Sequence, residues 1–362
     1  MLDSVFGKDT GRPIGNKDMN KISPLFDKKF VEPFFKEKIA PFYPEFSTIK
    51  KIKIIAHKKG VWGKKHYHVV LEYKTSFVKK EDGKTKTISI FCAAHDSEPR
   101  KNVHTVLKYL WKNSFSEGEL LVPKPLFYSA KFRGTFYQGL EGSHLYSYIR
   151  KKDKKMVEEI IPQAAAWFAK LHSLPIKKAK NFNQENSRIK TVVPGVKNTY
   201  EIIKDRYPKY LYIYKKAYGH FIKKEESFLK RKNCDISLVH GDAHPENVIK
   251  ISKKKIGVID FADLCLSDPA RDLGTFLQQL DYMAMRKIAD RKYVNKIKKL
   301  FLDSYFKNAN IEYTEGLQER IQMYYNWTLL RTATYFLLRV PSEPKRALVL
   351  LKQIKRRLNI KK

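Results

Sequence analysis

The sequence predicts an α+β protein with two parts: a small antiparallel β-sheet region, then a mainly helical region that carries one polar hairpin. Before about residue 138 the apolar residues gather in β-rich runs, whereas after Gly142 they recur every three or four residues, as on helices. Between residues 238 and 263 a polar segment interrupts the helical pattern. A chain of 362 residues, 43% of them hydrophobic, is long enough for two lobes with buried cores.

Residues 1–24 are rich in Gly, Asp, Lys and Asn, and we expect a loose N-terminal arm there. Residues 25–138 form the predicted sheet region. A first helix is expected between Asp27 and Ala40, with its start delayed by Pro33, and a second at Val103–Trp111. The predicted strands are Ile49–Ala56, Tyr67–Thr75, Thr87–Ala93, Leu126–Ala130 and Thr135–Gln138.

Residues 139–362 form the predicted helical region, and the hinge between the two parts is placed near residues 138–142. Apolar spacing of three and four predicts helices at Val157–Leu171, Asn198–Leu229, Ser267–Ile288, Val294–Tyr305, Gly316–Arg339 and Lys345–Leu358. Inside the polar segment, Val248–Ile251 and Ile256–Ile259 predict a tight strand pair.

The charge of the chain points to an anionic partner without naming it. Lysine and arginine number 73 against 37 acidic residues, which gives a net charge of +36. Nucleic acid, an acidic membrane surface and phosphorylated ligands would each suit that charge, and so would ordinary solvated surface, because the basic residues are scattered along the chain. The sequence has no zinc spacing, basic-helix repeat or aromatic-basic RNA motif, so no specific nucleic-acid partner is expected.

The remaining composition predicts a cytoplasmic protein. No apolar run approaches the roughly 18 residues of a membrane span, and the start of the chain has no apolar segment of the kind found in signal peptides. Three scattered cysteines do not form a disulfide framework.

The polar hairpin is the part of the sequence that carries chemistry. Asp242 and Asn247 lie on a loop between apolar segments, and Asp260 closes the returning strand. Carboxylate and amide oxygens converging in this way suit a Mg²⁺ ion that bridges phosphates, with one carboxylate left to accept a hydroxyl proton. The alternative is a turn in which the Asp and Asn side chains cap backbone amides.

The hairpin also resembles a known family. The run His-Gly-Asp-x-His-x-x-Asn at 240–247, followed by Ile-Asp-Phe-x-Asp at 259–263 and Asp-Pro-x-x-Asp-Leu at 268–273, is similar to the aminoglycoside phosphotransferase and choline kinase-like family. The resemblance extends from about Ile49 onward. It implies a bilobal protein-kinase-like fold, with ATP and Mg²⁺ as cofactors and a small-molecule hydroxyl as acceptor.

Position by position, the resemblance implies a role for each polar residue of the hairpin. Asp242 would be the catalytic base, and Asn247 and Asp260 would hold the metal. His244 stands where protein kinases have a lysine, and would either donate to the transferring phosphoryl group or serve as a hydrogen-bonded loop residue.

Three further polar residues would support the loop or extend its function. His240 would pack behind the loop, and Asp272 would fix the loop from the following helix. Asp263 would contact metal or substrate, or cap the next turn.

The first part of the chain matches the family less closely. Gly60 and Gly63 stand where a glycine-containing loop would cover the triphosphate. Gln138 and Leu140 match the positions whose backbone groups bond adenine. The strand at 88–95 lacks the lysine that usually holds the phosphates, and His104 replaces its glutamate partner.

A cation elsewhere must therefore hold the phosphates if ATP is used. Arg100 is the first candidate, because it lies at the start of the helix and its guanidinium suits two phosphate oxygens. Lys101 is beside it on the helix, and Lys58 and Lys64 on the covering loop are the fallback.

The acceptor is expected to bind in the helical region. Gln278, Asp281 and Tyr282 share a helix face by spacing, and an acidic and an aromatic group together would suit an amino alcohol. Trp327 and Tyr335 would contribute to that site or pack in the helical core.

The sequence thus predicts an ATP- and Mg²⁺-dependent phosphotransferase whose acceptor is an amino alcohol, a sugar, a nucleoside or an aminoglycoside-like compound. Two alternatives stay open. The missing lysine would fit a pseudokinase-like nucleotide-binding protein without strong catalysis, and the charge would fit a nucleic-acid-associated basic protein.

Overall fold

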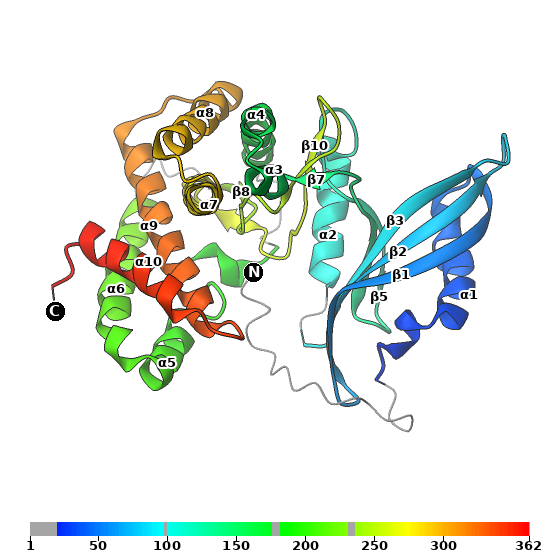
Figure 1. Cartoon of the computed structure of the whole chain (residues 1–362), viewed down its shortest axis with the longest axis horizontal. Helices are drawn as coiled ribbons and strands as arrows, with labels where there is room; N and C mark the ends of the chain where they lie inside the picture. Colours follow the sequence, from blue (N-terminus) through cyan, green and yellow to red (C-terminus); the bar gives the residue numbers. More distant parts are fainter. Residues whose placement is uncertain (1–19, 98–99, 176–181, 231–235, 362) are drawn as a thin grey trace. The chain divides into compact units, whose positions relative to one another are not determined.

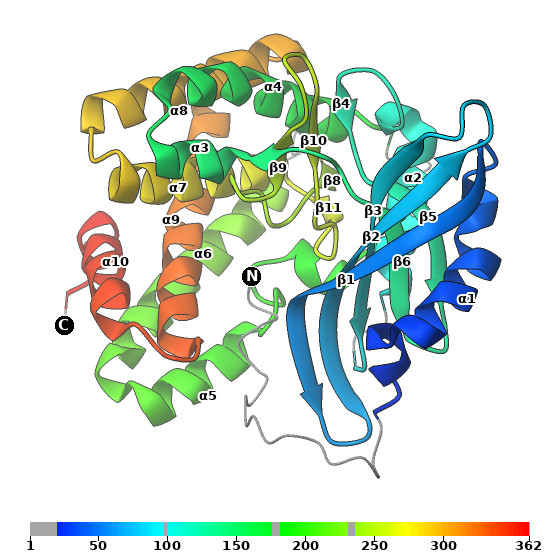
Figure 2. The same ribbon diagram turned by 45° about the vertical axis from the view of Figure 1, so that its right-hand side comes forward.

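The computed structural model describes residues 20–97, 100–175, 182–230 and 236–361, which fall into two compact units that meet between Gly142 and Ser143. Figure 1 shows a β-rich unit and a helical unit, and Figure 2 shows the same elements turned by 45°. The predicted N-terminal arm lies mostly outside the described residues. The α+β class and the kinase-like pattern of elements predicted from the sequence are confirmed.

The β-rich unit is built on one five-stranded antiparallel sheet in the order β1-β2-β3-β6-β5. Its strands are β1 (Phe46–Trp62), β2 (His66–Lys79), β3 (Thr85–His95), β5 (Lys124–Ser129) and β6 (Gly134–Gln138), with a short β4 (Leu120–Leu121). Two helices, α1 (Lys28–Lys38) and α2 (Lys101–Leu110), complete the unit.

Helix α1 covers one face of the sheet and forms the core of the unit with it (Figure 2). Val31 and Phe35 of α1 are fully buried in one hydrophobic cluster with Val69 and Leu71 of β2, and the ring of Phe35 lies 4.7 Å from that of Tyr73. The next side chains along β2 alternate to the opposite face, because side chains of a strand point alternately to its two sides. That opposite face carries the polar residues considered below.

Two sequence expectations for this unit are wrong. The first helix starts at Lys28 and contains Pro33, because the side chain of Asp27 caps it by accepting the N–H of Lys29 at 2.9 Å and tertiary burial offsets the proline. Strand β1 extends six residues beyond Ala56 to Trp62, since its pairing with β2 continues where its apolar alternation ends. Lysines on such an edge strand discourage pairing with other chains.

The helical unit contains eight α-helices and five short strands within its described residues. The helices are α3 (Leu145–Lys151), α4 (Lys154–His172), α5 (Val196–Arg206), α6 (Leu211–Leu229), α7 (Ala270–Lys287), α8 (Arg291–Ala309), α9 (Glu315–Leu338) and α10 (Pro344–Arg357). The strands are β7 (Ser143–His144), β8 (Ser237–Val239), β9 (Val248–Lys250), β10 (Ile256–Val258) and β11 (Cys265–Ser267), of which β7 is a two-residue bridge to β9.

The predicted hairpin is confirmed, since β9 and β10 pair antiparallel across a turn of lysines. The long helix expected from Asn198 to Leu229 is divided into α5 and α6, because Pro208 cannot continue a helix. Helix α7 is almost entirely buried between α8 and α9.

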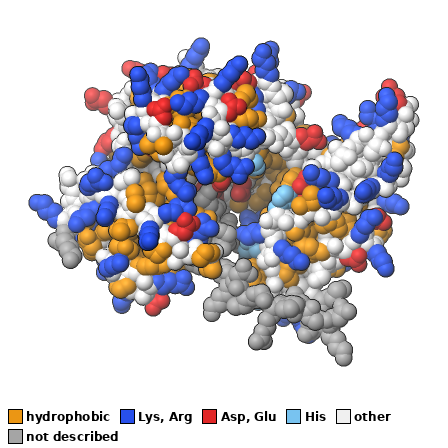
Figure 3. Space-filling view, viewed as in Figure 1, with side chains coloured by type: hydrophobic (Ala, Val, Ile, Leu, Met, Phe, Trp, Pro, Cys, Tyr) orange, Lys and Arg blue, Asp and Glu red, His pale blue; other side chains and the backbone are white. Residues whose placement is uncertain are grey.

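The positive charge is distributed over the surface. On the face shown in Figure 3, lysine and arginine side chains are spread over both units, with acidic side chains among them. None of the described helices is long and apolar enough to cross a membrane.

Candidate active site

The loop that carries Asp242 lies between short, buried strands of the helical unit. β8 leads into the loop and pairs with β11, and β9 leaves it and pairs with β10. The backbone N–H of Tyr146 donates to the carbonyl of Pro245 at 3.2 Å, and the His144 imidazole contacts the carbonyl of Glu246. Strand pairing therefore holds the loop at both ends, and the residues around α3 hold its second half.

The carboxylate of Asp242 lies in the middle of this loop. Its side chain is 13% exposed, and Nε2 of His244 lies 3.5 Å from its Oδ2. Burial acts to raise the pKa of Asp242, but the positive charges around the carboxylate, which among the described residues are His244 and Arg331, hold it well below its usual value. Asp242 is therefore ionised at neutral pH, as a proton acceptor must be.

Asp272, in the first turn of α7, holds the loop from behind. Its buried carboxylate accepts the backbone N–H groups of His240 at 2.6 Å and Gly241 at 2.9 Å. Nε2 of His172 lies 3.1 Å from the same carboxylate, and its Nδ1 lies 2.8 Å from the hydroxyl of Tyr305. Burial acts to raise the pKa of Asp272, but the hydrogen bonds and charges of these neighbours lower it.

His240 is fully buried beneath the loop. Its Nε2 donates to the carbonyl of Ile259 at 3.0 Å, and its Nδ1 accepts the backbone N–H of Asp242 at 3.3 Å. The ring packs on Phe261 and Trp167, with centroid distances of 5.2 and 6.3 Å. The position of His240 is that of a structural residue.

Asn247 and Asp260 stand on neighbouring strand ends, joined by a hydrogen bond of 3.0 Å from the N–H of Ile259 to the carbonyl of Asn247. The Nδ2 of Asn247 donates to the carbonyl of Asp242 at 2.9 Å, which leaves its amide oxygen as an acceptor. Asp260 has a left-handed backbone with φ of 68° and an exposed side chain.

This pair of oxygen ligands fits a Mg²⁺ ion, which takes one or two protein ligands and completes its shell with phosphates and water. No group of three or more His, Cys, Asp or Glu that could hold a metal occurs among the described residues.

Asp263 is tied down beside the loop. Its carboxylate bonds the side-chain amide of Asn186, and its backbone carbonyl faces Gly241. A Cβ on Gly241 would lie 2.3 Å from that carbonyl oxygen, and the φ of Gly241 is 84°. Only glycine therefore fits at this position of the loop.

The two predicted phosphate-loop glycines lie in different places. Gly60 is inside β1, opposite His68, where a Cβ would come within 2.5 Å of the Trp62 ring. Gly63 lies in the turn between β1 and β2 with φ of 54°. The expectation of one covering loop that holds both glycines is therefore wrong, because β1 continues to Trp62.

The predicted adenine-binding segment follows β6. The side chain of Gln138 accepts the hydroxyl of Tyr43 at 3.0 Å, and Leu140 is half-buried two residues later. The N–H of Gly139 donates to the carbonyl of Ser89 at 2.9 Å, which joins this segment to β3.

Basic side chains gather on the sheet face opposite α1. A guanidinium nitrogen of Arg100 lies 3.5 Å from Nε2 of His68, and Nζ of Lys58 lies 3.2 Å from the same nitrogen. The ring of His95 lies 4.4 Å from that of His68. Burial, together with the charges of Lys58 and Arg100, lowers the pKa of His68 to about 2. His68 is therefore neutral, and the positive charge belongs to the two cations.

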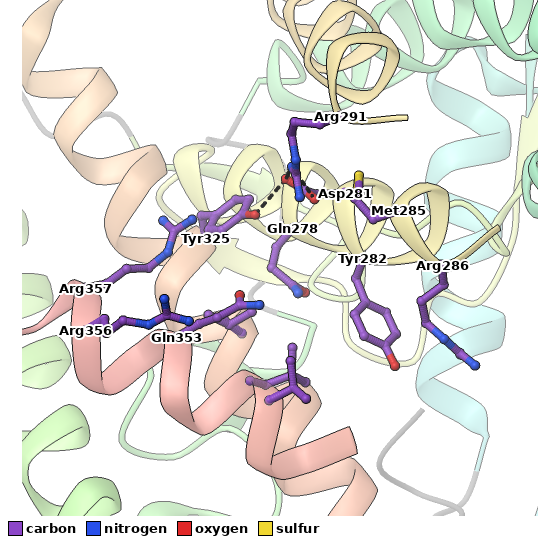
Figure 4. Close-up of a pocket in the computed structure, with 13 residues that line it drawn as sticks. Gln278, Asp281, Tyr282, Met285, Arg286, Arg291, Tyr325, Gln353, Arg356 and Arg357 are labelled. Atoms are coloured by element: carbon purple, nitrogen blue, oxygen red, sulfur yellow. Dashed lines mark hydrogen bonds and ion pairs between the residues drawn. The ribbon is translucent and has the colours of Figure 1, made fainter. Parts of the chain in front are cut away.

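Asp281 does not lie free for a substrate. It lines a cavity of about 580 Å³ between α7 and α10, where Figure 4 shows it pointing to Arg291 and Tyr325. Its carboxylate bonds Arg291 at 2.9 Å, Lys298 at 2.9 Å and the Tyr325 hydroxyl at 3.0 Å. Although burial acts to raise it, Lys298 and Arg291 lower the pKa of Asp281.

Of the aromatic acceptor candidates, Trp327 is buried in the helical core, whereas Tyr335 lines a second cavity, as does Tyr282. That cavity is about 150 Å³ in volume and also receives Glu246 from the loop.

Sequence reasoning missed two features. His68 carries no motif, and its place between two cations follows only from strand register. Arginines 286, 339 and 346, which line the smaller cavity, are separated in sequence and meet only when α7, α9 and α10 pack. A spacing of four along α9 is the one signal in the sequence that places Arg331, Tyr335 and Arg339 on one face.

Comparisons with known proteins agree with this geometry. The model of the family described as "Phosphotransferase enzyme family" matches residues 74–301, more than half of the chain. A search of curated proteins returned no match.

Solved structures share the fold at low sequence identity. An ethanolamine kinase of Plasmodium vivax is 15% identical with a TM-score of 0.56, and covers 95% of each chain. Amicoumacin kinase hAmiN is 12% identical with a TM-score of 0.54, and the match covers 92% of this chain and 96% of that one. A gentamicin complex of APH(2")-IIa is 14% identical with a TM-score of 0.54, and the match covers 93% of this chain and 97% of that one.

Proposed function

Since the chain belongs to the phosphotransferase enzyme family, we propose that it transfers the γ-phosphoryl group of ATP, with Mg²⁺, to a hydroxyl of a small molecule. The observation that carries this proposal is the buried, ionised Asp242, on a loop that Asp272 fastens and beside the oxygen pair of Asn247 and Asp260.

Each group of the loop has a task that its surroundings support. Asp242 accepts the proton of the acceptor hydroxyl, because it is ionised and fixed in place. His244, 3.5 Å from Asp242, donates toward the transferring phosphoryl group or holds the base in place. Asn247 and Asp260 hold Mg²⁺, which when bound neutralises charge on the phosphates.

The β-rich unit supplies the nucleotide site. Arg100 and Lys58 replace the strand lysine of related kinases, because both cations converge on one neutral histidine, where added negative charge is favoured. The turn at Gly63 lies over the phosphates, and the backbone of Gln138 and Leu140 bonds adenine.

Nucleotide binding without catalysis is the second candidate, since the segment of β3 from Ile88 to His95 lacks the lysine that usually holds the phosphates. The Lys58–Arg100 pair weighs against it because it restores the missing charge. A nucleic-acid function has no support from the face shown in Figure 3, where basic side chains are dispersed.

The test is a transfer assay with Mg·ATP across amino alcohols, sugars, nucleosides and aminoglycosides, read by mass spectrometry of the acceptors and by ADP formation. We expect at least one class to be phosphorylated in a Mg²⁺-dependent manner. Tight binding of Mg·ATP by calorimetry with no phosphorylated product would favour the second candidate, and absence of nucleotide binding would refute the proposal.

A further inference from the structure

The catalytic loop lines part of one cavity of the helical unit, about 150 Å³ in volume. Glu246 lines it from the loop, four residues after Asp242. Tyr282 of α7 and Phe336 of α9 provide apolar walls. The volume is well below the roughly 300–1,000 Å³ of sites for drug-sized ligands, which favours a small acceptor or a small part of a larger one.

The charges on the walls of this cavity are mainly positive. Arg286, Arg339 and Arg346 line it, and they share one neighbouring carboxylate, Glu343. Arg339 contacts Glu343 at 2.7 Å and Arg346 contacts it at 2.6 Å, whereas Arg286 forms no hydrogen bond or ion pair with any described residue. Three guanidinium groups against two carboxylates, Glu343 and the Glu246 of the loop, leave an excess of positive charge.

A fourth arginine extends this charge toward the catalytic base. Arg331 lies two turns before Arg339 on α9, and its charge acts on Asp242. The Nε atoms of both Arg331 and Arg339 are buried without a hydrogen-bond partner among the described residues. Buried donors of this kind normally have a partner, and of these two arginines Arg339 lines the cavity, where an acceptor atom would supply one.

In the described part of the chain, the acidic side chains at the smaller cavity are fewer than its arginines. Asp281 is held by Arg291, Lys298 and Tyr325, and Figure 4 shows Tyr282 and Arg286 turned away from it. Among the described residues that line the smaller cavity, Glu246 is the acidic one.

We infer that the acceptor carries an anionic group, a carboxylate or a phosphate, that Arg286 and Arg339 bind while its hydroxyl faces Asp242. The inference rests on the proposed phosphotransfer function. It distinguishes this chain from an enzyme for amines, whose ammonium group the arginines would repel. Arg346 stays with Tyr282, to which it donates at 2.9 Å, and stacks on Phe336 to shape the wall.

The test measures binding separately from transfer. The full chain is saturated with Mg²⁺ and the non-hydrolysable nucleotide AMP-PNP, and then titrated by calorimetry with glucose, glucosamine, gluconate and glucose 6-phosphate. We expect one or both anionic compounds to bind at least about tenfold more tightly than glucose or glucosamine. A comparison of the affinities for gluconate and for glucose 6-phosphate shows whether the site prefers a carboxylate or a phosphate.

Variants locate the anion site. Arg286→Gln should weaken anion binding about tenfold without a folding defect, because the guanidinium forms no hydrogen bond or ion pair with the described residues and contacts only the face of the Tyr282 ring, at 5.7 Å. Arg339→Gln should act in the same direction. Arg356→Gln, an exposed arginine on α10 outside the cavity, is the matched control and should bind as the wild type does.

Three results would overturn the inference: glucosamine binding as tightly as the anionic compounds, no binding of either anion, or an anion preference that survives Arg286→Gln and Arg339→Gln. Failure of AMP-PNP to bind would instead count against the proposed function, so the two failures are distinguishable.

Discussion

Replacing Asp272 by Asn tests how the catalytic loop is held. The carboxylate accepts three donors, the N–H groups of His240 and Gly241 and Nε2 of His172, at 2.6, 2.9 and 3.1 Å. An Asn side chain keeps the shape but offers one oxygen, so its NH₂ group must face at least one of these donors. Asp272→Asn therefore loses a charge-assisted hydrogen bond and leaves a buried N–H without an acceptor.

The cost follows from the burial of the site. A hydrogen bond to a charged group contributes about 1.5–3 kcal/mol, and an unsatisfied buried donor costs about 1–3 kcal/mol. Because these terms overlap, we expect the free energy of unfolding to fall by about 2–4 kcal/mol. Urea denaturation followed by circular dichroism of the helices measures it.

Asp260→Asn is the matched control. It makes the same chemical change on an exposed carboxylate, and Asn tolerates the left-handed backbone there. Its unfolding free energy should stay within about 0.5 kcal/mol of the wild type. Equal stability of the two variants would refute the role given to Asp272.

The effect of pH adds a second check. The pKa of Asp272 is lowered in the folded state. Its contribution to the free energy of unfolding is therefore complete above the unfolded pKa of about 3.9, and is lost as pH falls through the folded pKa. The gap between wild type and Asp272→Asn should be constant from about pH 7 to pH 5 and narrow only below about pH 4.

Two further predictions concern the cations of the β-rich unit. Arg100→Ala and Lys58→Ala should each raise the Michaelis constant for ATP several-fold, whereas the substitution of an exposed neighbour, Lys101→Ala, should raise it less. Steady-state kinetics with varied ATP measures this constant. Unchanged values for both Arg100→Ala and Lys58→Ala would show that these residues are not part of the nucleotide site. The folded pKa of His68 is about 2, below its unfolded value of about 6.5. Below pH 6.5 the unfolded chain therefore binds a proton on His68 that the folded protein does not. The free energy of unfolding falls by up to about 1.4 kcal/mol for each pH unit below that value. The unfolding free energy of wild type should therefore fall more between pH 7.5 and 5.5 than that of His68→Gln, and equal acid sensitivity would contradict the burial of a neutral His68.

The sequence predicted the loop and its supports because those residues lie close together along the chain. Asp242, Asn247 and Asp260 fall within one hairpin, so strand pairing alone brings them together. Asp272 follows at the start of the next helix, and the family resemblance indicated its role.

The rest could not be predicted, because it depends on contacts between distant segments. The extent of β1 follows from its pairing with β2, which its lysine-rich sequence conceals. The spacing of Asp281 along its helix predicted a carboxylate that binds the substrate. Once α7 and α8 pack, however, Arg291 and Lys298 form ion pairs with this carboxylate. Of the arginines of the smaller cavity, Arg286 lies on α7, Arg339 directly follows α9 and Arg346 lies on α10, and no local pattern relates them.

The central claim is that Asp242 is the base of a phosphoryl transfer. The most direct measurement is the first-order rate of γ-phosphoryl transfer from saturating Mg·ATP to the best acceptor, for wild type and for Asp242→Asn. The variant keeps the shape of the side chain and removes its charge, so we expect the rate to fall about 10²–10⁴-fold while calorimetry shows nucleotide binding retained. Transfer by Asp242→Asn at close to the wild-type rate would contradict the account.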